Sequence, residues 1–303
     1  MRVLLTGAGG FIGSQAARAL LASGCEVAAL LRPTTSPARL QDVLGRLSVV
    51  RADLADLPAL RQALLDWRPD ACLHLAWYAE PGKYLHSPQN IPALTTSLAL
   101  LEELARAGCR QVVMAGTCAE YDTDRGLLRE DGPTRPATVY AASKLALNLV
   151  GQQLAAAAGV RFAWARLFYL YGPSEDDKRV VPAVIRALSR GEPFPATQGE
   201  QVRDYLHVED VAAGLVTLVT QGAAGVFNVA SGVPVTVRQL METVGDLLGR
   251  PDLLRFGAVP YRDWEPRFIC GDNQRLRGLG WAPQYTLREG LAETVAWWQG
   301  ASR

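Results

Sequence analysis

The stretch MRVLLTGAGGFIGSQAARALLASGCE, residues 1–26, decides the fold. Residues 2–6 form a short apolar run of the kind found in strands buried inside a parallel sheet. Residues 11–23 follow with the periodicity of a helix. A glycine-rich turn joins the two, and a first strand that passes through such a turn directly into a first helix is typical of dinucleotide-binding folds.

Three glycines of this turn have distinct predicted roles. Gly7 allows a tight turn, Gly10 lets a pyrophosphate approach the backbone, and Gly13 lets the helix lie close to the sheet. The helix N-terminus adds free N–H groups and a partial positive charge, which suit an anionic phosphate. The alternative is an ordinary glycine turn, but such a turn does not need glycines placed between a first strand and a first helix in this way. We therefore expect a nucleotide site.

Bulk composition excludes several classes of partner. The chain has 303 residues, of which 49% are hydrophobic, enough for a large core or two coupled domains. Its net charge is +1, with 31 Lys and Arg against 30 Asp and Glu, so it predicts neither nucleic acid nor an anionic membrane as partner. No apolar run would span a bilayer, and the first residues do not read as a signal peptide.

Cysteine and histidine usage predicts no metal site. The five cysteines are odd in number and form no metal-type pair, which favours free thiols in a reducing cytoplasm. Of the three scattered histidines, His74 lies inside an apolar run, where a residue of the core or of a strand end is more common than a ligand.

Strands and helices alternate through the first half of the chain. The predicted strands are residues 2–6, 26–31, 48–52, 71–76, 111–116 and 161–168. The predicted helices between them include residues 57–67, 94–107 and 140–158. This alternation predicts an α/β Rossmann fold, a doubly wound parallel sheet covered by helices on both faces.

The second half changes character and predicts a smaller, interleaved lobe. We expect an NAD(P)-binding core over residues 1–168 and a mainly substrate-binding lobe over residues 169–303. Residues 208–230 hold a helix and a short strand that would return to the core. Residues 253–281 are expected to be irregular, with a closing helix near residues 287–298.

The end of the second strand bears on the cofactor. An acidic residue there binds the ribose 2′-OH of NAD, whereas an arginine nearby accommodates the 2′-phosphate of NADP. Here Arg32 follows the strand, with Thr34 and Thr35 behind it and no carboxylate at its tip. NADP(H) is therefore preferred, with NAD(H) and a solvated Arg32 as the alternative. Asp53 resembles the residue that meets adenine in such folds, and its alternative role is a helix cap.

Tyr140 and Lys144 lie four residues apart near a helix start and so share one face. A lysine ammonium beside the phenol, together with an oxidised nicotinamide, would lower its pKa from about 10 and suit it to proton exchange. Thr117 follows the fifth strand, at the edge where doubly wound sheets bind ligands. Its hydroxyl could share a substrate oxygen with Tyr140.

Together these segments resemble one family, the extended short-chain dehydrogenases/reductases of the nucleotide-sugar epimerase/dehydratase type. The matching segments are TGAGGFIGS (6–14), DLAD (53–56), HLA (74–76), YAASK (140–144), RLFYLYGP (166–173), VRDYLHVEDVA (202–212), VFNVASG (226–232) and LGWAP (279–283). They span nearly the whole chain in the family's order.

The resemblance implies hydride exchange with a nicotinamide, with Tyr140, Lys144 and Thr117 as the catalytic group. It implies that Arg203 binds a substrate diphosphate, with Arg262 as a second contact, and that Asn228 belongs to a strand motif. The alternative for Arg203 is a structural salt bridge with its neighbour Asp204, and the alternative for Arg262 is one with Asp263 or Glu265. It also implies a homodimer formed through two helices per subunit. The implied cofactor contacts are Gly7, Gly10, Phe11, Ile12, Gly13, Arg32, Asp53, Leu54, Leu75, Ala76 and Lys144.

Departures from the family pattern bear on the substrate. Cys118 and Ala119 stand where the family's dehydratases carry acidic residues, which argues against elimination of water. Glu120 comes one place later and, if strand alternation continues, points away from Thr117. Trp77 replaces a small residue and would narrow the sugar pocket, and Tyr169 replaces an asparagine in the implied substrate site.

Four functions follow from these observations. The favoured one is NADP(H)-dependent reduction of a 4-keto, often 6-deoxy, nucleotide-diphosphate sugar. A nucleotide-sugar 4-epimerase with retained NAD is the second, and a ketoreductase of a small molecule without a nucleotide is the third. A non-catalytic NADP-binding regulatory protein is the fourth, and it has no need for the Tyr140, Lys144 and Thr117 constellation.

Overall fold

The computed structural model describes residues 1–262 and 265–301. The opening stretch folds as predicted, with β1 (Arg2–Thr6), α1 (Phe11–Ala22) and β2 (Glu26–Leu31). β1 and β2 pair in parallel, with Arg2 opposite Glu26 and Thr6 opposite Leu30. The glycine turn therefore lies at the carboxyl end of the first strand, as a ligand-binding turn must.

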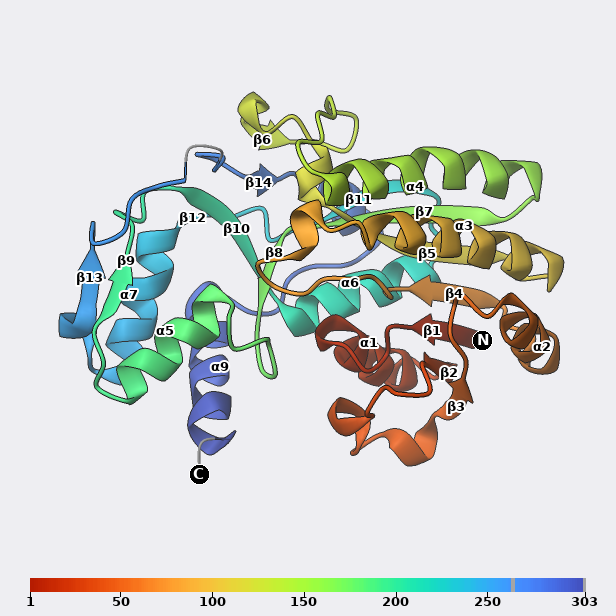
Figure 1. The fold of residues 1–303 in the computed structure, drawn as a ribbon, viewed down its shortest axis with the longest axis horizontal. Helices are drawn as coiled ribbons and strands as arrows, with labels where there is room; N and C mark the ends of the chain where they lie inside the picture. Colours follow the sequence, from red (N-terminus) through yellow and green to blue (C-terminus); the bar gives the residue numbers. More distant parts are fainter. Residues whose placement is uncertain (263–264, 302–303) are drawn as a thin grey trace.

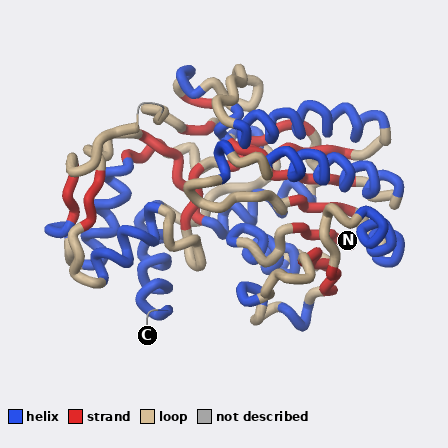
Figure 2. The backbone as a smooth tube through the Cα atoms, viewed as in Figure 1, coloured by secondary structure: helices blue, strands red, loops and turns tan. Residues whose placement is uncertain are grey.

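A seven-stranded parallel sheet forms the centre of the larger part of the molecule (Figures 1 and 2). Its order is β11-β7-β5-β4-β1-β2-β3, so the direction of winding reverses between β1 and β4, where such sheets open a ligand crevice. The remaining strands are β3 (Ser48–Arg51), β4 (Ala71–His74), β5 (Gln111–Thr117), β7 (Arg161–Leu167) and β11 (Gly225–Val229). The predicted α/β class is confirmed.

Helices cover both faces of this sheet because successive strand side chains point to opposite sides. Val3 and Leu5 belong to the core cluster that includes α1 and α6 (Val208–Thr220). Leu4 belongs to the opposite cluster, which includes α2 (Leu57–Trp67), α3 (Asn90–Arg106) and α4 (Val139–Ala157).

The start predicted for α3, at residue 94, was wrong. The helix begins at Asn90, since Pro92 falls in its first turn, where the missing N–H costs nothing.

A smaller lobe is built from the second half of the chain. Its three-stranded sheet has the order β12-β10-β8, and β9 pairs with β13 beside it. Val184, Leu240 and Leu291 belong to a separate core cluster under these strands. The elements of the lobe are β8 (Tyr169–Tyr171), α5 (Val180–Ser189), β9 (Phe194–Ala196), β10 (Val202–His207), β12 (Pro234–Thr236), α7 (Val237–Leu248), β13 (Leu254–Phe256) and α9 (Leu287–Ala301).

The chain crosses between the two parts more than once. After β10 it enters α6, which packs on α1, and β11 then joins the large sheet beside β7. The segment expected to be irregular contains β13, β14 (Cys270–Gly271) and the short α8 (Gln274–Arg277), and β14 pairs with β6 (Leu127–Leu128).

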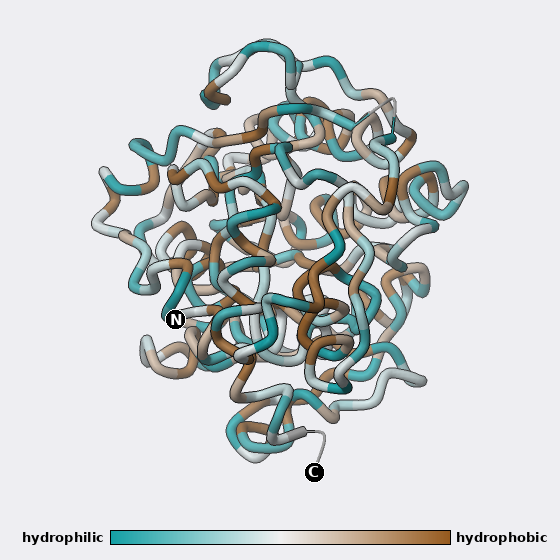
Figure 3. The backbone as a smooth tube through the Cα atoms, turned by 90° about the vertical axis from the view of Figure 1, so that its left-hand side faces the viewer, coloured by the Kyte–Doolittle hydropathy of each residue, from teal (hydrophilic) through white to brown (hydrophobic). Residues whose placement is uncertain are grey.

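The surface and the interior divide as expected for a globular chain. In Figure 3 many hydrophilic segments lie in the peripheral loops, while hydrophobic segments run through the middle. In the described part of the chain, no helix has the length and apolar character needed to cross a membrane.

Candidate active site

The glycine turn has the close contacts that its sequence predicts. Gly7 has φ +70°, and a Cβ there would lie 2.8 Å from the backbone N of Ala76. A Cβ on Gly13 would lie 2.0 Å from the carbonyl oxygen of Gly7, so the helix packs directly on the turn. Gly10 is the N-cap residue of α1 and provides no side-chain cap, and Phe11 and Ile12 lie in the first turn of the helix. The turn thus offers backbone N–H groups in a cradle that side chains would fill.

Arginines surround the loop that follows β2. Arg32 is exposed, and a Cβ on Gly9 would lie 3.1 Å from Cγ2 of Thr35, so this loop packs against the glycine turn. Arg51 Nη1 donates to the carbonyls of Arg32 (3.2 Å) and Thr35 (2.9 Å). Arg39 donates to Gly9 O at 3.5 Å.

Sequence reasoning missed Arg39 and Arg51. For Arg51 a signal existed, because it ends the neighbouring strand opposite Leu31. Arg39 reaches the turn only through the fold of the connecting segment.

Asp53 lies in the loop after β3, where its Oδ1 accepts from the N–H of Ala55 at 2.9 Å. Its alternative role as a helix cap is wrong, because Asp56 caps α2 by accepting from Ala59 N. Leu54 packs against the core cluster beneath the sheet.

His74 is the last residue of β4, and both nitrogens of its ring have hydrogen-bond partners. Its Nδ1 lies 2.8 Å from the hydroxyl of Thr6 and its Nε2 lies 2.8 Å from that of Ser97. The N–H groups of Leu75 and Ala76 in turn donate to the Thr6 hydroxyl at 3.2 Å. Burial, helped by the positive charge of Lys144, lowers the pKa of His74 to about 3. His74 is therefore a neutral strand-end residue, as predicted.

Thr117, Tyr140 and Lys144 meet at the carboxyl end of β5. Thr117 is the last residue of that strand, and Thr138 caps α4 so that Tyr140 lies in its first turn and Lys144 one turn later. Tyr140 and Thr117 share a side-chain hydrogen bond. The structure thus brings together the three residues that the sequence singled out.

The expected lowering of the Tyr140 pKa is not what the structure gives. Burial raises this pKa, as does the neighbouring Tyr84, and the hydrogen bond with Thr117 lowers it. Lys144 does not donate to the phenol; its Nζ donates to the carbonyl of Ala115 at 2.8 Å. Burial lowers the pKa of Lys144 to about 7, against the negative charge of Glu120, which raises it.

Glu120 does not follow strand alternation, so the expectation that it points away from Thr117 was wrong. The chain turns at Thr117 into the 3₁₀ turn Cys118–Glu120, and Oε1 of Glu120 folds back to accept from Thr117 N at 2.9 Å. Its Oε2 accepts from Arg166 Nε at 2.8 Å, and both residues are buried. Trp164 also donates to this carboxylate. Glu120 therefore anchors the end of β5 from beneath.

An aromatic cluster packs against the catalytic pair. The Trp77 ring lies edge-on to Tyr140 at 6.4 Å between centroids, and the Tyr84 ring does so at 4.8 Å. Nζ of Lys144 lies 3.7 Å from the Trp77 ring centroid. Asn90 is fully buried and accepts a 2.9 Å hydrogen bond from Nε1 of Trp77. Sequence reasoning found Trp77 but missed Tyr84 and Asn90, which carry no motif.

Arg203 is buried in β10 and pairs with Glu265, with 2.8 Å between Nη2 and Oε1. Its guanidinium also lies 5.3 Å from the ring of Tyr169. The expected alternative partner, Asp204, is wrong: its carboxylate instead accepts from the N–H groups of Ser231, Gly232 and Gly271.

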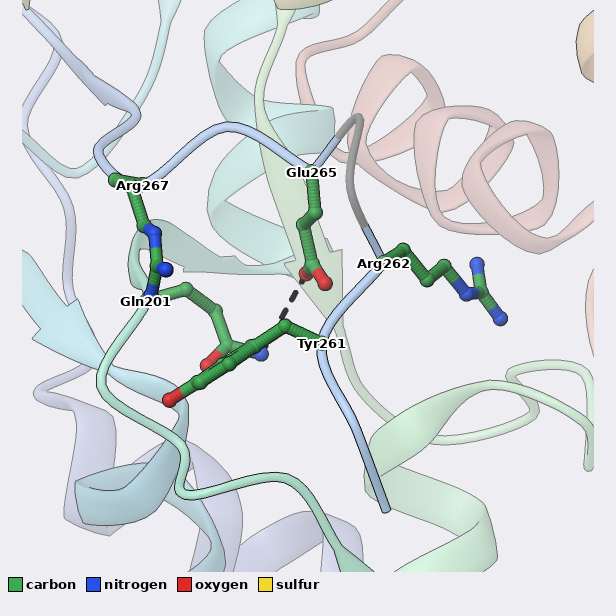
Figure 4. A pocket seen from close by; sticks show the side chains of 5 residues that line it. All are labelled: Gln201, Tyr261, Arg262, Glu265 and Arg267. Carbon is green, nitrogen blue, oxygen red and sulfur yellow. Dashed lines mark hydrogen bonds between the residues drawn. The ribbon is translucent and has the colours of Figure 1, made fainter. Parts of the chain in front are cut away.

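A pocket of about 220 Å³ opens beside this ion pair (Figure 4). Tyr261 stacks under the guanidinium of Arg267, while Arg262 points away from the other labelled side chains. Asp263, one of two expected partners of Arg262, lies outside the described residues, and the other, Glu265, pairs with Arg203. The lining residues are Gln201, Tyr261, Arg262, Glu265 and Arg267.

Asn228 has a structural role in β11. Its amide donates to the carbonyls of Leu128 and Asp272 at 2.9 Å, and its Oδ1 accepts from Tyr121 at 2.6 Å. It thereby ties β11 to β6 and to the segment that follows β14.

All five cysteines are buried and unpaired. Burial raises the pKa of Cys118, the nearest thiol to Thr117, to about 12, so it is held as a neutral thiol. Among the described residues, no three His, Cys, Asp or Glu side chains gather as a metal site would require.

The chain matches one family over most of its length. The model of the NAD dependent epimerase/dehydratase family matches residues 3–230. A dTDP-glucose 4,6-dehydratase of Streptomyces griseus is 32% identical over 316 residues, covering 98% of this chain and 93% of that protein. A UDP-glucose 4-epimerase of Mycolicibacterium smegmatis is 31% identical over 323 residues, covering 100% of both.

Solved structures agree with this match. The UDP-glucose 4-epimerase of Thermus thermophilus, determined in complex with NAD, superposes with a TM-score of 0.88. It is 28% identical, and the match covers 99% of this chain and 100% of that one. The fold and the order of elements described above are therefore those of known dinucleotide-dependent enzymes.

Proposed function

The chain belongs to the NAD-dependent epimerase/dehydratase family, and from this premise we propose that it reduces a 4-keto nucleotide-diphosphate sugar with NADPH. The observation that carries the proposal is the meeting of Thr117, Tyr140 and Lys144 beside the switch point of the sheet. A bound nicotinamide would supply the hydride. The chain's own residues bind and orient the substrate and manage the proton.

Tyr140 is the proton donor in this proposal. A raised pKa keeps the phenol protonated at neutral pH, as a donor to a carbonyl oxygen must be. Thr117 shares its hydrogen bond, so the two hydroxyls can address one substrate oxygen. Lys144, whose pKa is about 7, supplies positive charge that would favour the phenolate left behind.

The arginines after β2 support NADP(H) over NAD(H). No carboxylate stands at the tip of β2, and Arg32 is exposed there, with Arg51 bonded to the same loop and Arg39 bonded to Gly9. A guanidinium can bind a phosphate in a two-pronged geometry, whereas a ribose 2′-OH gains little from three positive charges. The relative of known structure from Thermus thermophilus carries NAD, so NAD(H) is the alternative.

The lobe formed by residues 169–303 would hold the nucleotide part of the substrate. The pocket beside Arg203 is lined by two further arginines, Arg262 and Arg267, and by the phenol ring of Tyr261. A diphosphate entering it would compete with Glu265 for Arg203. Tyr169, beside Arg203, extends the site toward Thr117, because Leu167, two residues before it, lies opposite Thr117 in the large sheet.

Dehydration is disfavoured although one relative is named a dehydratase. Elimination of water needs an acid and a base near the sugar. Cys118 is a buried thiol with a pKa near 12, Ala119 has no ionisable group, and Glu120 is locked under β5 by Arg166.

A 4-epimerase is the second candidate, and the named activity of the Mycolicibacterium smegmatis relative favours it. Both reactions use the same Tyr140 and Thr117. They differ in the fate of the cofactor: a reductase releases it oxidised, whereas an epimerase retains it and regenerates it.

We further propose a homodimer that works in the cytoplasm. Apolar side chains on α3 and α4 support the dimer, since Leu149 is 58% exposed, Val150 44% and Ile91 53%. Two helices per subunit would bury them in a four-helix contact. Buried, unpaired thiols suit a reducing compartment.

The identity of the copurifying cofactor tests these assignments. The mass and oxidation state of the nucleotide released from purified protein separate NADP from NAD. A tightly held NAD that survives turnover with a UDP-sugar supports the epimerase. Reduction of a free keto-sugar as fast as its nucleotide-linked form would exclude the diphosphate site and move the assignment to a small-molecule ketoreductase.

A further inference from the structure

We propose that Trp77 is a positioning residue for Lys144: its indole face stabilises the buried ammonium, and Asn90 fixes the ring in that place. The inference deepens the proposed function, since it concerns the proton chemistry of the same site. It assigns a role to a side chain that otherwise looks like a wall of the substrate pocket.

The Lys144 ammonium lies against the face of the Trp77 indole ring. Nζ of Lys144 lies 3.7 Å from the centroid of the Trp77 ring, within the range in which a cation is attracted by an aromatic face. The ammonium is buried, and it donates a hydrogen bond of 2.8 Å to the carbonyl of Ala115. The indole face thus replaces part of the lost hydration of the ammonium.

Hydrogen bonds of Asn90 fix the indole ring in this place. Asn90 is fully buried, accepts from Nε1 of Trp77, and donates to the carbonyls of Tyr84 (2.7 Å) and Ser87 (2.9 Å). One amide therefore holds the indole and the turn that carries Tyr84. Both rings pack edge-on against Tyr140, so Asn90 sets the geometry of the whole aromatic cluster.

The contact between the ammonium and the ring has an electrostatic consequence. Burial favours the neutral amine of Lys144, while a cation held by an aromatic face favours the ammonium. Weakening the face must therefore lower the Lys144 pKa, and the charged form that supports Tyr140 would be lost at a lower pH. A ring that only packs would leave this pKa unchanged when its electrons, but not its shape, are altered.

The other ionisable groups around Lys144 have settled roles. His74 faces it from β4 as a neutral ring, and Tyr140 lies on α4 itself as a neutral phenol. Glu120 faces it from the turn after β5 and is paired with Arg166 of β7. Tyr84 belongs to the turn packed on α4, and the charged residues of α3 lie near its far end, where Glu103 pairs with Arg61 and Arg106.

The test uses fluorinated tryptophan, which weakens the aromatic face and nearly keeps its shape. The lysines of the chain are Lys83, Lys144 and Lys178, so protein labelled with ¹³C at lysine Cε gives few signals and reports each amine directly. The matched control is Trp77→Phe grown in the same fluorinated tryptophan, in which only the other tryptophans change. Exposed Lys83 and Lys178 are internal references.

We expect the Lys144 pKa to fall stepwise from normal to monofluoro- to difluorotryptophan protein, by about half a pH unit over the series. It should stay constant across the series in the Trp77→Phe background. An unchanged Lys144 pKa, or an equal fall in the control, would overturn the proposal. If Trp77→Phe does not fold, Trp77→Tyr replaces it as the control background, in which the Lys144 pKa should likewise stay constant across the series. Because the measurement needs no turnover, absence of activity on nucleotide sugars would refute the proposed function and leave this inference standing.

Discussion

Buried Arg203 and partly exposed Glu265 form an ion pair beside the pocket, with 2.8 Å between Nη2 and Oε1. Nη1 of Arg203 also donates to the carbonyls of Val202 and Pro266. The guanidinium therefore holds a loop in place and also faces the proposed diphosphate. Arg203→Lys keeps the charge and loses the fork. We expect a higher KM for the nucleotide sugar, with NADPH affinity unchanged.

Steady-state kinetics and thermal unfolding of the Arg203→Lys variant separate the two roles. A lower melting temperature with little change in KM would show that Arg203 only ties the loop to the lobe.

Tyr140→Phe should remove most turnover and leave cofactor affinity nearly intact. Loss of a positioned proton donor costs roughly 10²–10⁴ in rate. Thr117→Ala should cost less, since a neutral hydrogen bond contributes about 0.5–1.5 kcal/mol. Single-turnover rates at saturating cofactor provide the measurement. Tyr140→Phe turning over at the wild-type rate would remove Tyr140 from the chemistry.

Glu120→Ala should destabilise the fold strongly, because it leaves the buried Arg166 without its carboxylate partner and the N–H of Thr117 without its acceptor. Removing one partner of a buried ion pair costs about 3–5 kcal/mol in free energy of unfolding. Asp42→Ala is the matched control, since its pair with Arg18 is exposed and contributes about 1 kcal/mol or less. Urea unfolding of both variants tests this, and equal losses would contradict it.

Arg32→Ala should weaken NADPH binding and leave NADH binding unchanged, since only NADPH carries the 2′-phosphate. Arg46→Ala is the control, because Arg46 is exposed in the turn before β3, at the opposite end of the sheet. Dissociation constants are compared at fixed salt, as charge pairs are screened. NADH binding as tight as NADPH in the wild type would make NAD(H) the cofactor.

Local sequence was enough to predict the large sheet. The run of residues 2–6 and the glycines after it determine strand, turn and helix through short-range sterics, and the structure reproduces them. Tyr140 and Lys144 were found for the same reason, as their spacing on a helix fixes their common face.

Contacts between distant segments could not be predicted in this way. Strand alternation at Glu120 failed because Gly116 leaves room for the carboxylate to fold back: a Cβ there would lie 2.7 Å from Oε1 of Glu120. Arg203 was expected to pair with its neighbour Asp204, yet its partner Glu265 comes from a loop that only the tertiary fold brings alongside. Asn90 carries no motif, and its three hydrogen bonds become visible only in the folded cluster.

In the proposed reduction, hydride passes between NADPH and C4 of a nucleotide-linked keto-sugar, and deuterium labelling follows this transfer atom by atom. NADPH deuterated at both C4 positions of the nicotinamide is incubated with the protein and a 4-keto-6-deoxy nucleotide sugar, and the product is read by mass and NMR. We expect consumption of NADPH and one deuterium at C4 of the sugar. An unlabelled sugar with NADPH unconsumed would contradict it.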